Sequence, residues 1–183
     1  MLVTPDNGGM RADIYTNDRK GTRRLKVSDG SSCFDEGRQF RISWEFNISN
    51  TPQVIRFESP VPFILRKQSL AVDDGGVRWR AFRVATEGGT FDTAINSTPS
   101  NSIPPRPYTQ QATVTTGGTI SNTGPATETI RMRASGSTAH RSTVGVSKSD
   151  FRQLDAGTYY LLFERLGNND AAGVFDLEWT EVC

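Results

Sequence analysis

The segment at residues 40–48, FRISWEFNI, carries an apolar residue at every second position. The apolar members are Phe40, Ile42, Trp44, Phe46 and Ile48. Because side chains of a β-strand point alternately to its two faces, this pattern predicts a strand with one apolar and one polar face. The apolar face of such a strand requires a second sheet to cover it.

Two later segments have equally clear patterns. Residues 174–180 (VFDLEWT) repeat the alternation of apolar and polar positions. Residues 158–166 (TYYLLFERL) are apolar on both faces through residues 159–163, which indicates a central strand covered on both sides. We expect these two segments to supply the cover for residues 40–48.

Shorter strand patterns lie between these segments, separated by turn sequences rich in Gly, Asn, Asp and Pro. They fall at residues 53–58, 63–72, 77–85, 91–95, 108–115 and 129–133. The sequence Asp73-Asp74-Gly75-Gly76 is the strongest β-hairpin signal, because Asp-Gly and Gly-Gly pairs tolerate the positive φ of a tight turn. It predicts that residues 63–72 pair with residues 77–85. Gly88-Gly89 and Gly117-Gly118 are also predicted to be hairpin glycines.

Two stretches depart from the strand pattern. Residues 149–154 are predicted to form one helical turn, with Ser149 as the N-cap and Gly157 as the stop. Residues 96–107 contain four prolines and predict an extended loop. A disordered linker between two domains is the competing interpretation, which we reject because neither flanking part is self-sufficient in core strands.

Composition favours an all-β fold. Hydrophobic residues make up 35% of the 183 residues, whereas Gly, Ser, Thr and Pro are plentiful, which indicates short strands joined by many turns. A chain of this length suits one domain. We predict an antiparallel, jelly-roll-like β-sandwich over residues 40–183. Residues 1–39 have few large apolar groups beyond Ile14-Tyr15 and Leu25 to Val27, so they are predicted to form an extended N-terminal arm.

Charge is balanced overall but unevenly placed. Lys and Arg number 21 against 20 Asp and Glu, so the net charge of +1 provides no global field for nucleic acid or an anionic membrane. Basic residues gather between Met10 and Ser28, and acidic residues predominate from Asp150 onward. These regions either meet, within one chain or between copies, or are solvated independently. The sequence has no apolar signal-peptide core and no stretch approaching 18 apolar residues, so we predict neither a signal peptide nor a membrane span.

No residue set has a catalytic or metal-binding pattern. His140 is the only histidine, it lies in a polar stretch, and no G-x-S-x-G elbow accompanies it. Cys33 and Cys183 have neither the number nor the spacing of a metal site, and two free thiols are favoured over one bridge between them. We therefore predict that the chain is not an enzyme, with no catalytic residues, no cofactor and no metal site.

Two other residue sets have both a structural and a binding interpretation. Asp73 and Asp74 fit turn chemistry, with a surface calcium site as the alternative. Trp44, Trp79 and Trp179 stand in the apolar phase of their strands. That phase favours core packing over an exposed sugar-binding platform.

Arginines occupy the polar phase of two predicted strands. They are Arg78, Arg80, Arg131 and Arg133. Alternation places them on the face opposite their apolar neighbours. Because the net charge is near zero and no stacking aromatics are interleaved, a protein interface or plain solvation is favoured over nucleic-acid binding.

Five segments resemble small virion structural proteins of tailed bacteriophages. They are Glu45 to Ile48 (EFNI), Pro62 to Leu70 (PFILRKQSL), Arg80 to Phe91 (RAFRVATEGGTF), Val114 to Ile120 (VTTGGTI) and Leu154 to Gly167 (LDAGTYYLLFERLG). The similarity extends over residues 40–183. Such proteins commonly have a β-sandwich body with an extended arm, assemble in many copies, and decorate or cement the capsid or belong to the tail. The resemblance implies a structural role without catalysis and transfers no site residues.

The expected function is therefore that of a structural virion protein, in particular a capsid decoration or cement protein that stabilises the head by protein-protein contacts. Its expected partners are other copies of itself, as a homo-oligomer, and the major capsid protein or tail- and portal-associated proteins, with no nucleic acid and no membrane. The expected location is the virion, assembled in the host bacterial cytoplasm. A tail, collar or head-fibre component is the nearest alternative, and a carbohydrate-binding β-sandwich module is the alternative from another class.

Overall fold

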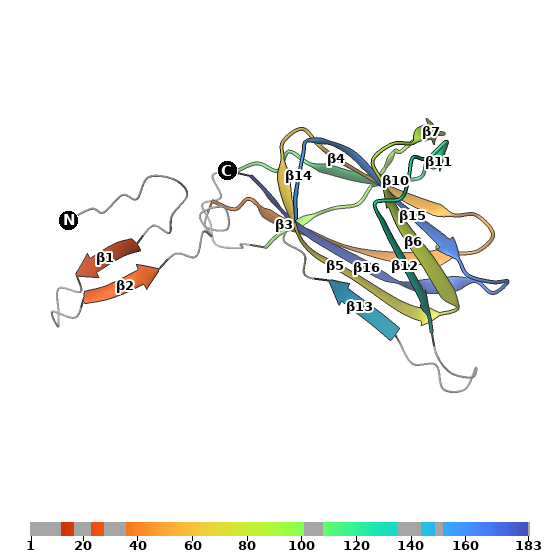
Figure 1. Cartoon of the computed structure of the whole chain (residues 1–183), viewed down its shortest axis with the longest axis horizontal. Coiled ribbons are helices and arrows are strands. Elements are labelled where there is room, and N and C mark those ends of the chain that lie inside the picture. The colour runs from red at the N-terminus through yellow and green to blue at the C-terminus, as the bar shows by residue number, and fades with distance from the viewer. Residues whose placement is uncertain are drawn as a thin grey trace.

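The protein is built of antiparallel β-sheets. The structure is a computed structural model that describes residues 12–16, 23–27, 36–100, 108–134, 144–148 and 152–182. Within these residues every regular element is a β-strand. Two large sheets pack face to face over a shared apolar core (Figure 1). The predicted all-β, antiparallel β-sandwich is confirmed.

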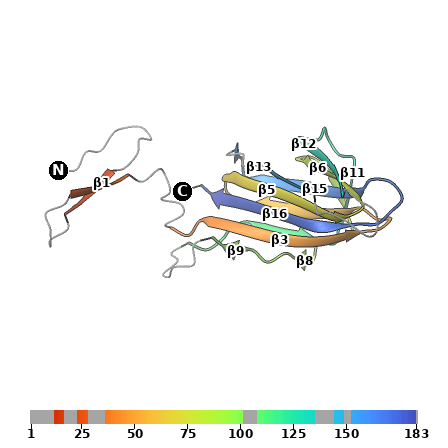
Figure 2. The same cartoon turned by 90° about the horizontal axis from the view of Figure 1, so that it is seen from below.

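The first sheet contains both amphipathic strands predicted near the ends of the body. Its order is β13 (Val144–Lys148), β5 (Phe63–Asp74), β16 (Ala171–Glu181), β3 (Gln39–Ile48) and β9 (Thr98–Pro99), and β14 (Arg152–Leu154) also pairs with β5. Strands β3 and β16 lie side by side in this sheet (Figure 2). The expectation that residues 174–180 cover residues 40–48 from another sheet is therefore wrong, because the two segments are neighbours in one sheet.

The second sheet supplies the cover. Its order is β12 (Glu128–Arg133), β6 (Gly76–Phe82), β15 (Gly157–Arg165), β4 (Gln53–Ser59), β10 (Thr113–Thr116) and β8 (Thr93–Ala94). Strand β15 lies between β6 and β4, and its residues 159–163 are all buried. The prediction of a central strand covered on both sides is confirmed.

Two small strand pairs lie outside the large sheets. Strands β7 (Thr86–Gly88) and β11 (Thr119–Ser121) form a pair that we call the flap. Strands β1 (Ala12–Thr16) and β2 (Arg23–Val27) pair only with each other among the described strands, and they contain the two apolar groups of the N-terminal segment. The role of residues 1–39 as an arm stays a prediction.

Consecutive strands of the body switch between the sheets. Strands β5 and β6 flank the sequence Asp73 to Gly76 but belong to different sheets, so the predicted hairpin is wrong. The turn itself is present, with Gly75 at φ 69°. A Cβ atom at Gly75 would stand 2.2 Å from the carbonyl oxygen of Asp170, so the glycine permits two turns that join the sheets to approach closely.

The other predicted hairpins are wrong for the same reason. Strand β7 pairs with β11 rather than with β8, and β10 pairs with β4 and β8 rather than with β11. Gly118 lies against the ring of Phe91, where a Cβ atom would be 2.4 Å from a ring carbon. Glycine pairs thus mark the turns correctly, but burial of the apolar faces decides which strands pair.

Two local predictions also differ from the structure. Residues 152–154 form strand β14, not a helical turn, because they pair in register with Phe63 to Leu65 of β5. Within the predicted loop at 96–107, β9 pairs with Phe40 and Arg41 as a short edge strand. Residues 101–107 and 149–151 lie outside the described residues, as do Cys33, His140 and Cys183.

The core between the sheets is rich in aromatic rings. Trp79 and Trp179 are almost fully buried, which confirms their predicted core position. Trp44 is half-buried at the margin of the core and contacts Phe163 edge-on, with ring centroids 5.1 Å apart. The three tryptophans therefore form no exposed platform.

Candidate interaction surfaces and an inter-sheet cavity

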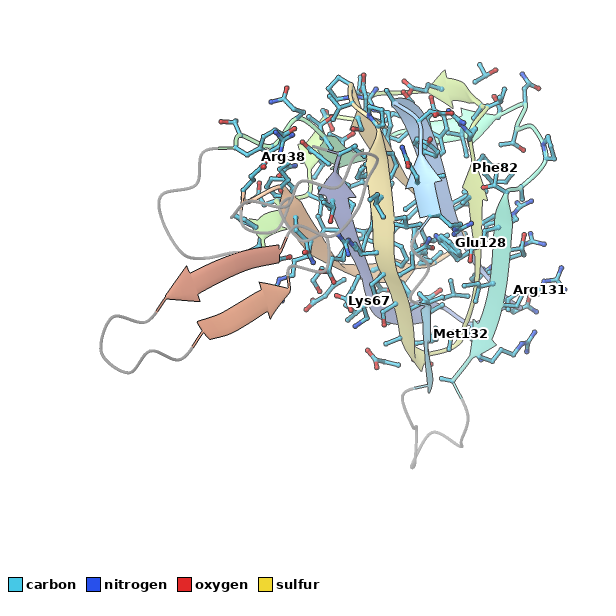
Figure 3. All side chains as sticks on the ribbon, turned by 60° about the vertical axis from the view of Figure 1, so that its left-hand side comes forward. Arg38, Lys67, Phe82, Glu128, Arg131 and Met132 are labelled. Carbon is cyan, nitrogen blue, oxygen red and sulfur yellow. The ribbon has the colours of Figure 1, made fainter. Side chains whose placement is uncertain are left out.

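The four predicted arginines lie together on the outer face of the second sheet. The pairing of β6 with β12 places Arg78 opposite Arg131 and Arg80 opposite Thr129. Their sequence neighbours Trp79 and Met132 point into the core. Figure 3 shows Arg131 on the outer side of β12. We call Arg78, Arg80, Arg131 and Arg133 the arginine stripe.

One carboxylate partly neutralises this stripe. Glu164 of β15 accepts hydrogen bonds from Arg78 Nε at 2.9 Å and from Arg80 Nη2 at 2.7 Å. Arg131 and Arg133 are exposed and have no ion pair within the described part of the chain. Four guanidinium groups against one carboxylate leave a surplus of about three positive charges on a rigid sheet face.

The flap covers the neighbouring part of the same outer face. Beneath it lies a second apolar cluster made of Val54, Phe82, Phe91, Tyr160 and Leu162. This cluster explains why the sequence of β15 is apolar on both faces, since Tyr160 and Leu162 point away from the main core. The outer face is thus divided between a covered apolar part and an open basic part.

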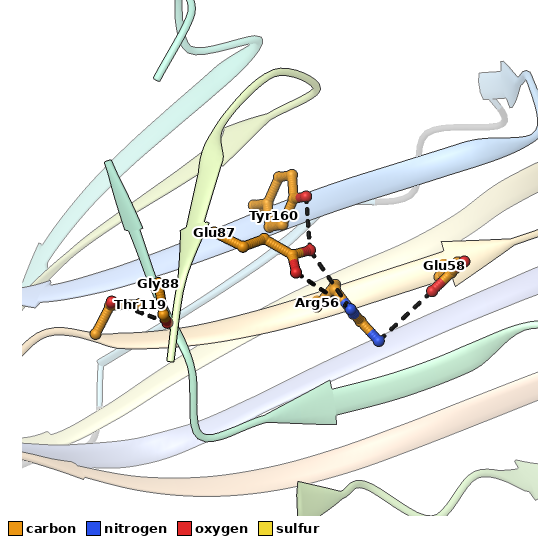
Figure 4. Close-up of polar contacts among 6 residues, drawn as sticks. All are labelled: Arg56, Glu58, Glu87, Gly88, Thr119 and Tyr160. Atoms are coloured by element: carbon orange, nitrogen blue, oxygen red, sulfur yellow. Dashed lines mark hydrogen bonds and ion pairs between the residues drawn. The ribbon is translucent and has the colours of Figure 1, made fainter. Parts of the chain in front are cut away.

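A polar network fastens the flap to the sheet (Figure 4). The hydroxyl group of Tyr160 donates to Glu87 Oε1 at 2.8 Å, and Arg56 Nη1 lies 3.4 Å from the Glu87 carboxylate. Arg56 also lies 3.6 Å from Glu58, and its guanidinium group is 5.2 Å from the ring centre of Phe91. Burial, as the largest cause, and the hydrogen bond to Glu87, as the next, raise the pKa of Tyr160 to about 12. The phenol therefore serves as a structural donor at neutral pH.

A buried carboxylate fixes the opposite end of the sandwich. Glu181 is fully buried and accepts hydrogen bonds from the Tyr108 hydroxyl at 2.6 Å and from the backbone N–H of Ala112 at 2.8 Å. The backbone N–H of Gln111 also donates to it. Burial, as the largest cause, and the hydrogen bond to Glu181, as the next, raise the pKa of Tyr108 to about 12. The guanidinium group of Arg38 lies 4.1 Å from the centre of the Tyr108 ring.

A cavity of about 100 Å³ lies between the two sheets. Apolar side chains from both sheets line it, and the polar side chains of Gln68 and Trp79 share its wall. Beside it, Glu128 of β12 and Arg152 of β14 form an ion pair with 2.7 Å between Oε2 and Nη2. This ion pair connects the two sheets, and nothing in the sequence patterns pointed to the cavity.

Among the residues that the structure describes, no group of three or more His, Cys, Asp or Glu side chains is placed to hold a metal ion. The same residues contain no helix that is long and apolar enough to cross a membrane. The expected absence of catalysis, metal and cofactor stays a prediction.

Comparisons with protein-family models, with curated proteins and with solved structures found no match to this chain. The structural observations that bear on function are therefore the arginine stripe, the flap and the cavity. The resemblance to phage structural proteins stays a prediction. Among the described residues, the stripe is a surface that both the sequence pattern and the structure bring together.

Proposed function

We propose that this protein is a structural protein of a tailed-bacteriophage virion, in particular a capsid decoration or cement protein that stabilises the head by protein-protein contacts. The observation that carries the proposal is the arginine stripe on the outer face of a rigid sheet. The sequence resemblance over residues 40–183 supports the same role. The partners would be the major capsid protein and other copies of this chain.

The strand order supports a jelly-roll fold for such a role. Without the short strands β7 to β11, the body has eight strand positions, which we number 1 to 8 along the chain. They are β3, β4, β5, β6, β12, the β13–β14 pair, β15 and β16. One sheet then has the order 1-8-3-6 and the other has the order 2-7-4-5. Two interleaved Greek keys would produce this arrangement, so it supports our proposal of the jelly-roll topology that occurs in viral capsid and lectin domains.

The stripe is suited to adhesion on an acidic protein surface. Guanidinium groups bind carboxylates through paired, planar hydrogen bonds. Each such contact at an exposed rim contributes little by itself. On a shell that presents many identical sites, however, modest contacts at each subunit are multiplied by copy number. Exposed Arg131 and Arg133 would make the first contacts because they have no ion pair within the described residues.

A charge-reversal experiment tests the proposal. The double variant Arg131→Glu/Arg133→Glu should bind at least about ten-fold more weakly to phage heads that lack this protein, measured by co-sedimentation, because attraction becomes repulsion. Binding of the unaltered chain should also weaken as salt is raised. Electron cryomicroscopy of the complete virion would show whether the chain sits on the head.

The matched control is Arg41→Glu/Lys67→Glu, which changes the charge equally on the exposed outer face of the first sheet. Its binding should stay within about two-fold of the unaltered chain. Equal binding by both double variants would contradict a role for the stripe. A position on the tail, collar or head fibre would favour the nearest alternative.

A carbohydrate-binding module is the second candidate function, and one observation favours it. Half-buried Trp44 lines a surface groove together with Asn47, Gln53 and Thr119. An aromatic ring beside amides and hydroxyls is a common way to bind sugars. This candidate predicts that glycans shield Trp44 from acrylamide quenching and that Trp44→Ala abolishes the effect.

A further inference from the structure

The cavity between the sheets lies where strands β12 and β14 approach each other across the side of the sandwich. Most of its wall is apolar and comes from β5 and β16 of the first sheet and from β4, β6 and β15 of the second. The apolar wall residues include Phe57, Phe63, Leu65, Tyr159, Leu161 and Leu177. The space lies between the two sheets, is walled mainly by core side chains, and is partly open at its margin.

Two buried polar side chains on the wall have atoms without a hydrogen-bond partner. Gln68 is 7% exposed and its Oε1 has no partner, and Trp79 is 1% exposed and its Nε1 has none. Buried polar groups are nearly always hydrogen-bonded, because leaving them unpaired is costly. An acceptor and a donor on a mostly apolar wall are the features of a small-molecule site.

We infer that this cavity binds a small, uncharged, mostly apolar molecule that carries one hydroxyl group. A hydroxyl donates one hydrogen bond and accepts others, so it matches the needs of Gln68 Oε1 and Trp79 Nε1. The volume exceeds the share of about 30 Å³ that one water occupies, and it is smaller than the roughly 150 Å³ cavity known to bind benzene. Because the cavity is partly open at its margin, it has room for a ligand of about the size of phenol or a short alcohol. A charged ligand is disfavoured by desolvation. This inference goes beyond the proposed virion role and does not depend on it.

The ion pair between Glu128 and Arg152 lies at the margin of this site. Both residues line the cavity, and the pair joins one sheet to the other with 2.7 Å between its nitrogen and oxygen atoms. Glu128 is the more buried partner, with its side chain 10% exposed. A link between two edge strands at this place limits how far the sheets separate, so it restricts entry to small molecules.

Nuclear magnetic resonance of the ¹⁵N-labelled full chain tests the inference. Phenol and benzene are titrated separately while the indole N–H resonance of Trp79, assigned with the variant Trp79→Phe, is followed. Phenol should shift this resonance saturably and bind about ten-fold more tightly than benzene, because one added hydrogen bond changes affinity by about that factor. Gln68→Leu should abolish the preference for phenol, and Ala81→Leu, which fills the cavity wall, should abolish binding of both probes.

Gln53→Leu is the matched control, since Gln53 Oε1 also lacks a partner but Gln53 does not line this cavity. It should leave both affinities unchanged. Gln68→Met serves as a second, nearly isosteric variant if Gln68→Leu does not fold. The inference is overturned if neither probe gives a saturable shift, as when the cavity holds only water, or if the phenol preference survives both Gln68 variants.

Discussion

Two tyrosines act as hydrogen-bond donors to glutamates in different parts of the fold. Tyr108 donates to buried Glu181 at one end of the sandwich, and Tyr160 donates to Glu87 in the flap. In both cases burial contributes most to raising the pKa of the phenol, and the hydrogen bond adds to it. Both pKa values reach about 12, compared with about 10 for a free tyrosine.

These shifts predict a specific loss of stability in alkali. The folded pKa values lie above the unfolded value, so the stabilisation is fully present below pH 10 and is lost as the pH rises from about 10 to about 12. Ultraviolet titration at 295 nm should show Tyr108 and Tyr160 ionising near pH 12, and Tyr108→Phe and Tyr160→Phe should each remove one of these late phenols. Burial also raises the pKa of Tyr159, so its phenol should ionise above its usual range in both variants. In the guanidinium-unfolded chain all four tyrosines should ionise near pH 10. A native titration with no late step would contradict the prediction.

Single residues show what the sequence reveals and what it hides. Glu181 falls on the apolar phase that runs through Phe175, Leu177 and Trp179, so the alternation could have predicted its burial. The sequence analysis counted it only among the acidic residues from Asp150 onward. The burial of Gln68 could not be predicted from the sequence. Its inward position depends on a register shift between β5 and β16, after which the buried positions of β5 change phase. The cavity polar groups therefore depend on a bulge that no local pattern announces.

The pairing of β16 with β5 requires a glycine at position 173. The register shift lies between Ala172 and Gly173, and a Cβ atom at Gly173 would stand 2.1 Å from the carbonyl oxygen of Ala71. It would also stand 2.7 Å from the ring of Phe46. Because the closer atom belongs to the backbone of a central strand, neither side can move away cheaply.

Gly173→Ala is therefore expected to destabilise the protein by about 3 kcal/mol, at the upper end for overpacking. Urea unfolding monitored by tryptophan fluorescence would measure the loss. Gly124→Ala is the control, because its Cβ atom would meet only Val84 at 3.4 Å, an ordinary contact, and its effect should stay below about 1 kcal/mol. Similar effects for both variants would mean that the bulge tolerates a side chain.

Strand faces were predictable and strand partners were not. Alternation identified β3, β16 and the double-faced β15 because the hydrophobic period is a property of each strand alone. Pairing depends on which apolar faces meet across the whole chain, so the turns at Gly75 and Gly117 were mistaken for hairpins. The arginine stripe was predicted correctly as a set, since Arg78 and Arg131 lie in the polar phase of two strands that prove to be neighbours.

The second sheet has two faces with different roles in the molecule. Its inner face closes the core and the ligand cavity, and its outer face is divided between the flap and the arginine stripe. The stripe therefore stands on strands whose opposite faces are fixed by core packing, which keeps its charges in a constant arrangement. A surface held in this way can bind a partner without rearrangement, which suits the proposed role as a cement protein.

The boundary between the N-terminal segment and the body can also be placed from contacts. The carbonyl oxygen of Arg38 accepts from Glu181 N–H at 3.0 Å, and Arg38 Nη1 donates to the carbonyl oxygen of Val182 at 3.2 Å. The carbonyl oxygen of Gln39 accepts from Ser100 N–H at 2.8 Å. These contacts join residues 38 and 39 to the sandwich, although the sequence pattern assigned them to the arm.

Two truncations should therefore behave differently. Deleting residues 1–35 should leave the melting temperature within about 2 °C, while deleting residues 1–39 should lower it by about 4–8 °C through a loss of about 2 kcal/mol. If residues 1–35 act as an arm that orders on a partner, both truncated chains should lose association, measured by analytical ultracentrifugation and binding to heads. Equal melting temperatures would show that the contacts of Arg38 and Gln39 add little, and a shorter chain that still associates would assign the binding surface to the sandwich alone.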